Sequence, residues 1–279
     1  MGIIVKTALD SENLWMIFKV ANNLYALNSD QIKSIGTLPS NITGVPDGEP
    51  YVRGITKHRG KVITLLEMRV LFDNQTQEEE LDAFAKMLDV RKADHTKWVD
   101  TLDKSVKSGT AFPLATDPHK CAFGKWYDNF ETNITNVQFH LDKIEEPHRL
   151  LHEAAMHIEH LVGEDKEEQR IEILQEVETV YMPKVIALLD ETKEIIKDHF
   201  RDMMIVMESD NERTVAIIVD EIIGVERLGE RYSDTILEKM QHSELLGGVA
   251  LREQDDALLF LIDEEKIFQL GQEPQATEI

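Results

Sequence analysis

The hydrophobic pattern of the chain changes its period twice, which divides the sequence into three sections. Up to about residue 81, and again from about residue 201, short apolar runs are separated by polar turns, as is typical of β-hairpins. Between residues 82 and 200, the apolar positions recur at helical spacing. The pattern therefore predicts a multidomain α+β protein, in which an all-helical section, 82–200, interrupts two β sections, 1–81 and 201–279.

The two β sections share one order of elements. In the first, residues 14–27 form a predicted hairpin that turns at Ala21-Asn22-Asn23, because asparagine tolerates the left-handed backbone of such turns. Residues 51–66 form a second predicted hairpin. In the last section, residues 203–219 and 248–262 repeat this order at an offset near 190 residues. We therefore predict two β modules of one design, for which small closed or nearly closed barrels are suitable.

The middle section contains four stretches of helical periodicity. Apolar residues follow helical spacing over 83–106, 122–142, 147–162 and 164–200. Pro183 is expected to kink or divide the last of these helices. The links between the stretches are short and polar, which favours an antiparallel four-helix bundle. Such a unit can be inserted into a β-turn, because the two ends of a turn already lie close together.

The charge balance narrows the classes of partner. The 279-residue chain carries 53 acidic and 30 basic residues, a formal charge of −23, and 42% of its residues are apolar. A chain this acidic repels phosphate backbones and anionic lipid, so we expect neither nucleic acid nor membranes as partners. The sequence shows no apolar run of the ~20 residues that cross a bilayer and no secretion signal. Its single cysteine, Cys121, fits a reducing compartment, and we expect a soluble cytoplasmic protein.

Histidines concentrate in the helical section together with the single cysteine, which indicates a metal site. His148 and His152 follow Pro147, a residue favoured in the first turn of a helix, and their spacing of four places both imidazoles on one face. Cys121 lies near the start of a helix, where unpaired amides favour a thiolate, the best remaining zinc ligand. For the fourth ligand the spacing leaves open His95, His119 and His140, and does not clearly exclude His160.

An enzyme has weaker support. Arg149 follows His148, so the metalloprotease pattern of two histidines with a general-base glutamate between them is absent. Four protein ligands would leave no open zinc position for a reactive water. The sequence contains no Gly-rich phosphate loop and no G-x-S-x-G elbow. A di-iron, oxygen-binding bundle of the hemerythrin type needs more inward-facing carboxylates and histidines than we can place. We therefore expect no catalytic residues.

One run in the first β section follows a known pattern. In Tyr51–Ile63, a Gly54-Ile55 pair is followed by Arg59-Gly60 and then by a strand. This run is similar to the signature of the CheW-like adaptors, the chemotaxis coupling protein family, although Lys57-His58 replaces the usual Asn-Leu and Glu67 the usual aspartate. The stretches Val219–Val225 and Leu246–Val249 look like the second barrel of that family. The resemblance implies a scaffold that bridges chemoreceptors and the histidine kinase CheA, with Arg59 on the receptor-facing side.

The helical section carries three further motifs. They are His95-x-x-Trp98, Cys121-x-x-Gly124-x-Trp126, and His148-x-x-x-His152 followed by Ala155. This set resembles the chemoreceptor zinc-binding domain, called CZB. The resemblance implies a four-helix unit that binds zinc through His95, Cys121, His148 and His152, and it selects His95 over His119. We expect Asp117, four residues before the cysteine, to orient a ligand.

The two resemblances together imply a zinc-responsive signalling adaptor. Zinc ties three helices together, so its loss, or oxidation of the zinc thiolate, is expected to change coupling. The alternative is a scaffold in which zinc only holds the inserted section folded. The resemblance also suggests that the inserted section forms a homodimer.

Overall fold

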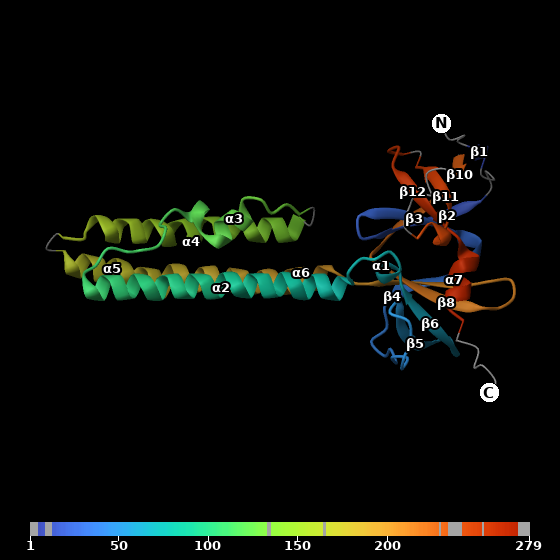
Figure 1. The fold of residues 1–279 in the computed structure, drawn as a ribbon, viewed down its shortest axis with the longest axis horizontal. Helices are drawn as coiled ribbons and strands as arrows, with labels where there is room; N and C mark the ends of the chain where they lie inside the picture. The colour runs from blue at the N-terminus through green and yellow to red at the C-terminus, as the bar shows by residue number, and fades with distance from the viewer. Residues whose placement is uncertain are drawn as a thin grey trace. The chain divides into compact units, whose positions relative to one another are not determined.

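The computed structural model describes residues 5–8, 13–132, 135–163, 166–228, 230–233, 242–252 and 254–272 (Figure 1). Contacts divide the chain into two compact units. One unit is Met1–Gln77 with Phe200–Ile279, called here the β unit, and the other is Glu78–His199, called here the helical unit. The chain is therefore of mixed α and β structure, with strands and long helices in separate units.

The β unit contains twelve strands among its described residues. These are β1 (Val5–Ala8), β2 (Leu14–Val20), β3 (Asn23–Asn28), β4 (Ile32–Thr37), β5 (Val52–His58), β6 (Lys61–Glu67), β7 (Met203–Glu208), β8 (Thr214–Val219), β9 (Glu221–Arg227), β10 (Glu230–Ser233), β11 (Leu246–Leu251) and β12 (Leu258–Ile262). The short helices α1 (Met68–Leu71) and α7 (Glu264–Leu270) follow β6 and β12, and the 3₁₀ turns η1 (Ser29–Gln31) and η5 (Ser243–Leu245) precede β4 and β11. Apart from the short strands β1 and β10, the order of three strands, a hairpin and a helix occurs twice, in agreement with the repeat.

The strands form two sheets that each draw on both β sections. One sheet has the order β1-β10-β11-β12-β3-β2-β9, and the other β4-β7-β8-β6-β5. The first hairpin of each section therefore joins strands of the other section, through the parallel pairs β12–β3 and β6–β8. The two sections are not separate modules, because β3 and β8 are mostly buried and each needs a pairing strand on both sides. The sheet orders include no closed barrel among the described residues, although the bridge Thr43↔Ile55 joins the segment after β4 to β5 at the far edge of the five-stranded sheet, so the expected barrels are not confirmed.

The predicted hairpins are present, with one change in turn chemistry. Strands β2 and β3 pair from Trp15↔Asn28 to Val20↔Asn23. The left-handed residue of this turn is Ala21, with φ 51°, and not an asparagine. The Ala21 amide donates to the Asp220 carboxylate at 2.7 Å, which supports the turn from outside the hairpin. The local sequence therefore predicted the turn but not the residue that adopts the unusual backbone.

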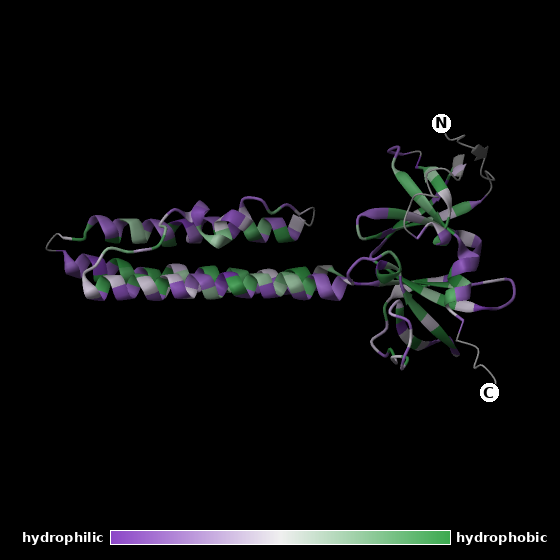
Figure 2. Cartoon of the chain, viewed as in Figure 1, coloured by the Kyte–Doolittle hydropathy of each residue, from purple (hydrophilic) through white to green (hydrophobic). Residues whose placement is uncertain are grey.

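Apolar side chains from both sections fill the interior of the β unit. Phe18, Leu66, Ile205 and Ile217 are fully buried in one cluster, and Figure 2 shows the apolar colouring along the strands. Burial of such side chains stabilises a fold by roughly 1.5–3 kcal/mol each. The two sections of chain are therefore held together by a shared core as well as by strand pairing.

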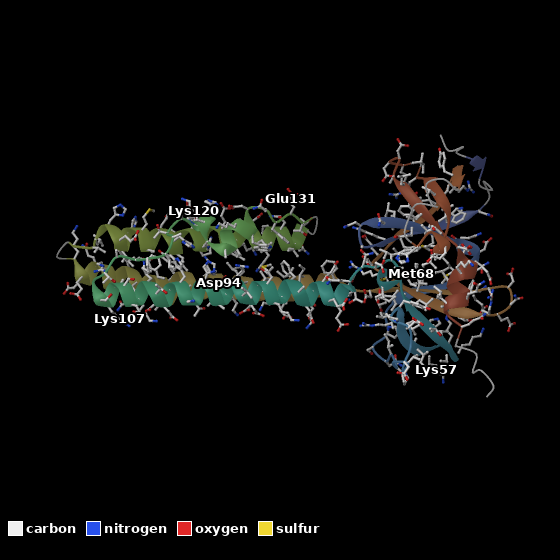
Figure 3. The ribbon with its side chains drawn as sticks, in the orientation of Figure 1. Lys57, Met68, Asp94, Lys107, Lys120 and Glu131 are labelled. Atoms are coloured by element: carbon white, nitrogen blue, oxygen red, sulfur yellow. The ribbon has the colours of Figure 1, made fainter. Side chains whose placement is uncertain are left out.

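A buried ion pair lies where the chain leaves the β unit. Helix α1 begins at Met68, labelled in Figure 3, and its second residue, Arg69, is 4% exposed. The Arg69 guanidinium donates to both Asp220 oxygens at 2.7 and 2.8 Å and to the Gln75 carbonyl at 3.0 Å. The pair thus fixes the end of β8 to the segment that leads into the helical unit.

The helical unit has two long helices, a third long helical segment that contains a π-helical turn, and one short helix. Its elements are α2 (Gln77–Ser108), the 3₁₀ turn η2 (Pro118–Lys120), α3 (Ala122–Tyr127), α4 (Thr135–His160), α5 (Glu167–Glu176), the π-helical turn η3 (Val177–Tyr181) and α6 (Met182–His199). The described helices include none that is long and apolar enough to span a membrane.

The helical unit differs from the expected antiparallel four-helix bundle in its short second helix, while the directions of its long helices are those of an up-down-up-down order. The His95 ring lies against His148, and Trp98 lies against His152, so α2 and α4 run in the same direction. The ion pairs Lys92–Asp190 and Lys193–Asp89 show that α6 runs opposite to α2. The described part of the return between α2 and α4, residues 109–132, holds only η2 and α3, because prolines and glycines interrupt this stretch.

Two prolines behave differently from each other. Pro147 lies inside α4 rather than at a helix start, so the predicted break between 142 and 147 is wrong. An interior proline removes the hydrogen bond to the carbonyl four residues earlier, here that of Lys143, but the helix continues because its buried face is held by packing. Pro183 follows the π-helical turn Val177–Tyr181, which widens the helix at the position where a division was expected.

Candidate metal centre

Four side chains from three elements converge inside the helical unit. His95 comes from α2, Cys121 precedes α3, and His148 and His152 come from α4. One potential ligand atom from each lies within 4.8 Å of all the others. Among the described residues this is the one group of three or more histidine, cysteine or acidic side chains with such spacing. The structure therefore brings together the four residues that the sequence analysis selected.

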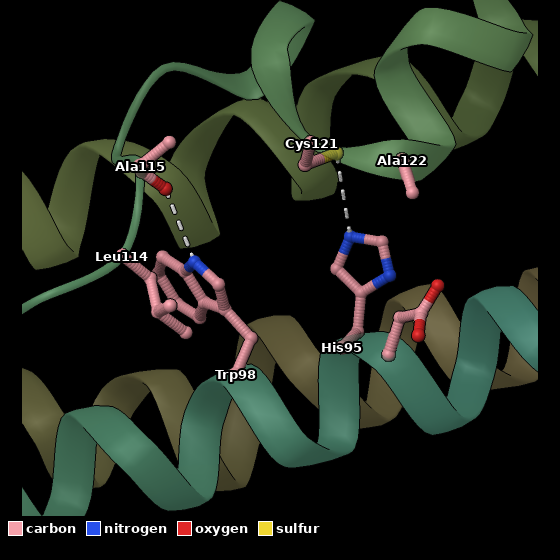
Figure 4. Close-up of a pocket in the computed structure, with 7 residues that line it drawn as sticks. His95, Trp98, Leu114, Ala115, Cys121 and Ala122 are labelled. Carbon is pink, nitrogen blue, oxygen red and sulfur yellow. Dashed lines mark hydrogen bonds between the residues drawn. The ribbon is translucent and has the colours of Figure 1, made fainter.

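The separations are close to those of a tetrahedral zinc site. Zinc–nitrogen bonds of about 2.0–2.1 Å and zinc–sulfur bonds of about 2.3 Å place neighbouring ligand atoms roughly 3.3–3.6 Å apart. The Cys121 Sγ atom lies 3.3 Å from His148 Nε2 and 3.9 Å from His95 Nε2 (Figure 4). A small inward movement of His95 would complete the contact, so the donor set fits zinc in both chemistry and spacing.

His95 is held in the orientation that a metal ligand requires. Its side chain is 3% exposed, and Nδ1 donates to the Arg91 carbonyl at 2.8 Å. This hydrogen bond fixes the tautomer that leaves the Nε2 lone pair free on the side of the Cys121 sulfur. The Arg91 carbonyl was missed by the sequence analysis, although the spacing of four residues on one helix could have indicated it.

Cys121 occupies the N-cap of α3, and its sulfur accepts a hydrogen bond from the Gly124 amide at 3.1 Å. A Cβ atom at Gly124 would lie 2.0 Å from the Pro118 carbonyl oxygen, so a glycine is required there. The Cys-x-x-Gly spacing thus has a physical reason. Burial nevertheless raises the pKa of the Cys121 thiol, against the effect of the Gly124 and Phe123 amides. The amides at the helix start therefore favour the thiolate, as expected, but burial of the metal-free site outweighs their effect.

His148 and His152 lie one turn apart on the buried face of α4. Burial, with smaller effects from the His152 and His95 imidazoles, lowers the pKa of His148 to about 2. Burial and the nearby His95 lower the pKa of His152 to about 4. Both imidazoles are therefore neutral at neutral pH, the form that binds metal ions.

The His152 ring provides the test of whether a metal fits. It is fully buried, and neither Nδ1 nor Nε2 makes a hydrogen bond of standard geometry among the described residues, although the Thr116 backbone lies close enough to raise the pKa of the ring against the effect of burial. A buried polar group without a partner costs about 1–3 kcal/mol. A metal ion bound to one of these nitrogens would satisfy it, so the four residues fit zinc better than they fit a metal-free core.

The competing histidines lie in other environments. His119 is exposed and contacts Asp128 through Nδ1 at 3.0 Å, while His140 is buried with Nε2 3.2 Å from the Leu188 carbonyl. His160 is exposed and its Nδ1 donates to the Met156 carbonyl. These three histidines have their own partners and lie outside the four-residue cluster.

Asp117 makes its hydrogen bonds within its own turn, while its charge raises the pKa of His152, so its expected role toward a ligand stays a prediction. Its carboxylate accepts from the His119 amide at 3.0 Å and pairs with Lys120 at 3.1 Å, which caps η2. It therefore shapes the turn that precedes Cys121 rather than hydrogen bonding to a ligand side chain among the described residues. Arg59 lies in the β5–β6 turn, exposed and with φ 45°, in the β unit.

Aromatic rings surround the cluster. The Phe123 ring contacts His95 and His148 edge-on at 5.8 and 4.9 Å, and Trp98 lies 4.7 Å from the His152 ring. The Trp98 indole donates to the Ala115 carbonyl at 3.1 Å (Figure 4). Phe123 was also missed by the sequence analysis, because an apolar residue between motif positions carries no separate signal. These rings exclude water and strengthen electrostatic interactions within the site.

Comparison with known proteins agrees with both resemblances. Residues 14–97 match the CheW-like domain, and residues 95–159, which include all four clustered residues, match the chemoreceptor zinc-binding domain. No curated protein matches the chain. Among solved structures, the chain is similar to the scaffolding protein TtCheW from Thermoanaerobacter tengcongensis, with 11% identity and a TM-score of 0.38 over 90% of this chain and 83% of that chain.

Proposed function

Because the chain carries a CheW-like domain and a chemoreceptor zinc-binding domain, we propose that it is a cytoplasmic chemotaxis adaptor whose coupling responds to zinc. Its partners are chemoreceptors and a CheA-type histidine kinase, and Arg59 contributes to the partner surface. The observation that carries the metal part is the cluster of four donors around a buried His152 that has no other partner among the described residues.

The residues that would hold the zinc are His95, Cys121, His148 and His152. Bound zinc would stabilise the Cys121 thiolate and join α2, the start of α3 and α4. When zinc leaves, the three buried imidazoles lose the ion that they share, and the cluster must change its packing or its hydration. A ligand shifts an equilibrium only by its differential affinity, so the zinc-bound and zinc-free helical units must differ in shape or order. Oxidation of Cys121 to sulfenic acid would remove the thiolate ligand and act in the same direction as zinc loss.

A second candidate is a scaffold in which zinc is purely structural. It is favoured by the deep burial of the three imidazoles, which are 3%, 5% and 0% exposed. A closed structural zinc site contributes folding free energy without any change in signalling. The two functions differ in whether partner binding follows the zinc content.

The test compares zinc content with partner binding. Zinc per chain is measured on protein purified metal-free and then loaded, for the wild type, Cys121→Ala and the control His119→Ala. Kinase and receptor capture are measured with and without chelator, and the native mass reports whether the chain forms a homodimer. We expect one zinc per chain in the wild type and in His119→Ala, loss in Cys121→Ala, and partner binding that changes on chelation. One zinc with unchanged partner binding would indicate the structural role, and no zinc would contradict the site.

A further inference from the structure

A cavity of about 160 Å³ adjoins the four-residue cluster. Its wall is formed by Asp94, His95, Trp98, Leu114, Ala115, Cys121 and Ala122. Figure 4 shows Trp98, Leu114 and Ala115 together on one side, and Cys121 beside Ala122. Apolar side chains form most of this wall. The cavity is about as large as an engineered apolar cavity that admits benzene. Small reagents can therefore be accommodated beside the cysteine sulfur.

The cavity reaches only part of the cluster. His95 and Cys121 line it, whereas His148 and His152 do not. His148 is 5% exposed and His152 is fully buried, while Cys121 is half-buried. A reagent that enters the cavity therefore meets the Cys121 sulfur before it can reach the two histidines of α4.

One segment covers the cavity, and we call residues 109–117 the strap. Most of the strap has no regular secondary structure, and Leu114 is 43% exposed on it. Its attachment to α2 includes the Trp98 indole, which donates to the Ala115 carbonyl at 3.1 Å. Phe112, 5% exposed, packs edge-on against the same indole at 4.9 Å. Trp98 thus holds the strap by one hydrogen bond and one ring contact.

We propose that this cavity is the route by which metal ions and small thiol reagents reach Cys121, and that the Trp98–Ala115 hydrogen bond keeps the strap closed so that large reagents are excluded. The metal part of this inference rests on the proposed function, whereas the thiol part does not. Trp98 is a positioning residue in this role, because it acts through the strap.

The thiol part is tested on the metal-free full chain. Cys121 is the single cysteine, so the intact mass reports its alkylation without interference. The rates with iodoacetamide, a small reagent, and with fluorescein maleimide, a bulky one, are compared between the wild type and Trp98→Phe. This variant keeps an aromatic ring but removes the indole N–H. We expect the bulky reagent to react about five- to tenfold faster, the factor for loss of one ordinary hydrogen bond, and the small reagent to change less.

Two further variants make the test specific. Ala122→Leu places a larger side chain at the cavity wall, and we expect it to slow both reagents. Trp126→Phe is the matched control, because Trp126 lies on α3 outside the cavity wall, and we expect wild-type rates. Equal acceleration of both reagents in Trp98→Phe, or no slowing in Ala122→Leu, would contradict the route. Pulsed hydrogen exchange on each variant identifies a rate change that comes from unfolding of the helical unit.

The metal part uses the rate at which a chelator captures bound zinc, expressed per zinc initially bound. We expect faster capture from Trp98→Phe and slower capture from Ala122→Leu. If no zinc binds while the alkylation rates follow the expected order, the proposed function fails and the route to Cys121 stands. If zinc binds but neither its release nor the alkylation rates respond to these variants, the route is wrong and the zinc site is unaffected.

Discussion

Two buried polar side chains, Arg69 in the β unit and His152 in the helical unit, differ in whether the protein supplies their partners. In the β unit, the buried Arg69 guanidinium finds Asp220 and the Gln75 carbonyl within the same unit. In the helical unit, the fully buried His152 has no partner for either ring nitrogen among the described residues. Buried polar groups are stable only when they are satisfied. The comparison teaches that Arg69 is satisfied by the protein itself, while the His152 ring is placed for a ligand that its own unit does not supply.

The largest expected effect concerns zinc and is confined to the helical unit. A ligand that binds only the folded state stabilises it by about 4 kcal/mol when its free concentration is a thousandfold above Kd. Zinc should therefore slow hydrogen exchange throughout 78–199 and leave the exchange of strands β2–β8 unchanged. The measurement is hydrogen exchange with mass spectrometry on the metal-free and zinc-loaded chain.

The control for this prediction is His119→Ala, which lies near Cys121 but outside the cluster. It should respond to zinc as the wild type does, and Cys121→Ala should respond much less. Equal zinc protection in both units would contradict the assignment of the zinc site to the helical unit.

The next largest effect is expected from Arg69→Ala in the β unit. Removing one member of a buried ion pair leaves the other without a partner, which commonly costs about 3–5 kcal/mol. We expect the lower end, about 3 kcal/mol, because the Ala21 amide still donates to the Asp220 carboxylate. Urea unfolding of the β unit, followed by pulsed hydrogen exchange, measures the loss.

Lys61→Ala provides the matched control for Arg69→Ala. Lys61 pairs with Glu208 at 2.8 Å on the surface of the same unit. Exposed pairs contribute about 0–1 kcal/mol, so this variant should change stability little. Similar losses of unfolding free energy in the two variants would show that burial does not make the Arg69–Asp220 pair more stabilising than an exposed pair.

The difference between the two units also explains what the sequence could predict. The spacing of His148 and His152 needs only a helix, and the Cys121 motif lies at a helix start, so local pattern was sufficient for both. The fourth ligand depends on which face of α2 meets α4, a tertiary contact that spacing cannot supply. The resemblance to a known domain, and not the periodicity, selected His95.

The hydrophobic pattern could not predict that strands of one β section pair with strands of the other. Strand β3 pairs with β12 through Leu24↔Leu259, and a buried apolar strand has the same sequence pattern whichever strand lies beside it. Pro147 led to a wrong prediction because proline is favoured at a helix start. The sequence pattern alone cannot show that packing keeps α4 continuous at this proline. Order and type of elements were thus predictable, while long-range pairing and helix continuity were not.

A pH-dependent prediction concerns a second buried charged group of the β unit, Glu67. Glu67 is 4% exposed, and burial, with the negative charge of Asp202, raises its pKa to about 7. Arg53 opposes this shift, and Asp220 adds to it. The folded state therefore binds the proton more tightly than the unfolded state, so its contribution is fully present below about pH 4.5 and is lost as the pH rises through 7.

Glu67→Gln mimics the protonated form and removes this dependence. Relative to the wild type, it should gain roughly 2–3 kcal/mol of stability between pH 4.5 and pH 7.5, since one pKa unit corresponds to about 1.36 kcal/mol. Urea unfolding at several pH values measures the difference between the two proteins, which cancels the other titrating groups. Burial raises the pKa of Glu67, whereas Lys61 lowers that of Glu208, so Glu208→Gln should show the opposite sign. A constant difference for Glu67→Gln across this range would contradict the prediction.

The smallest expected effect tests the comparison of Arg69 and His152 most directly. It measures whether the buried His152 ring destabilises the helical unit when no metal is bound. In metal-free protein, His152→Leu replaces an unsatisfied buried imidazole by an apolar side chain. Removing a buried polar group that has no partner recovers about 1–2 kcal/mol of its desolvation cost. We therefore expect the metal-free helical unit of this variant to be more stable than that of the wild type, measured by urea unfolding.

His140→Leu is the matched control on the same helix. His140 is 5% exposed, like the ligand histidines, but its Nε2 atom is 3.2 Å from the Leu188 carbonyl. The same substitution there breaks a hydrogen bond, so it should destabilise the unit by about 1 kcal/mol. His152→Leu should at the same time abolish stabilisation by zinc, which His140→Leu should retain. Two buried histidines on one helix would then respond with opposite signs, because one has a partner in the protein and the other lacks one until metal binds; equal destabilisation by both would mean that the metal-free cluster is already a satisfied core.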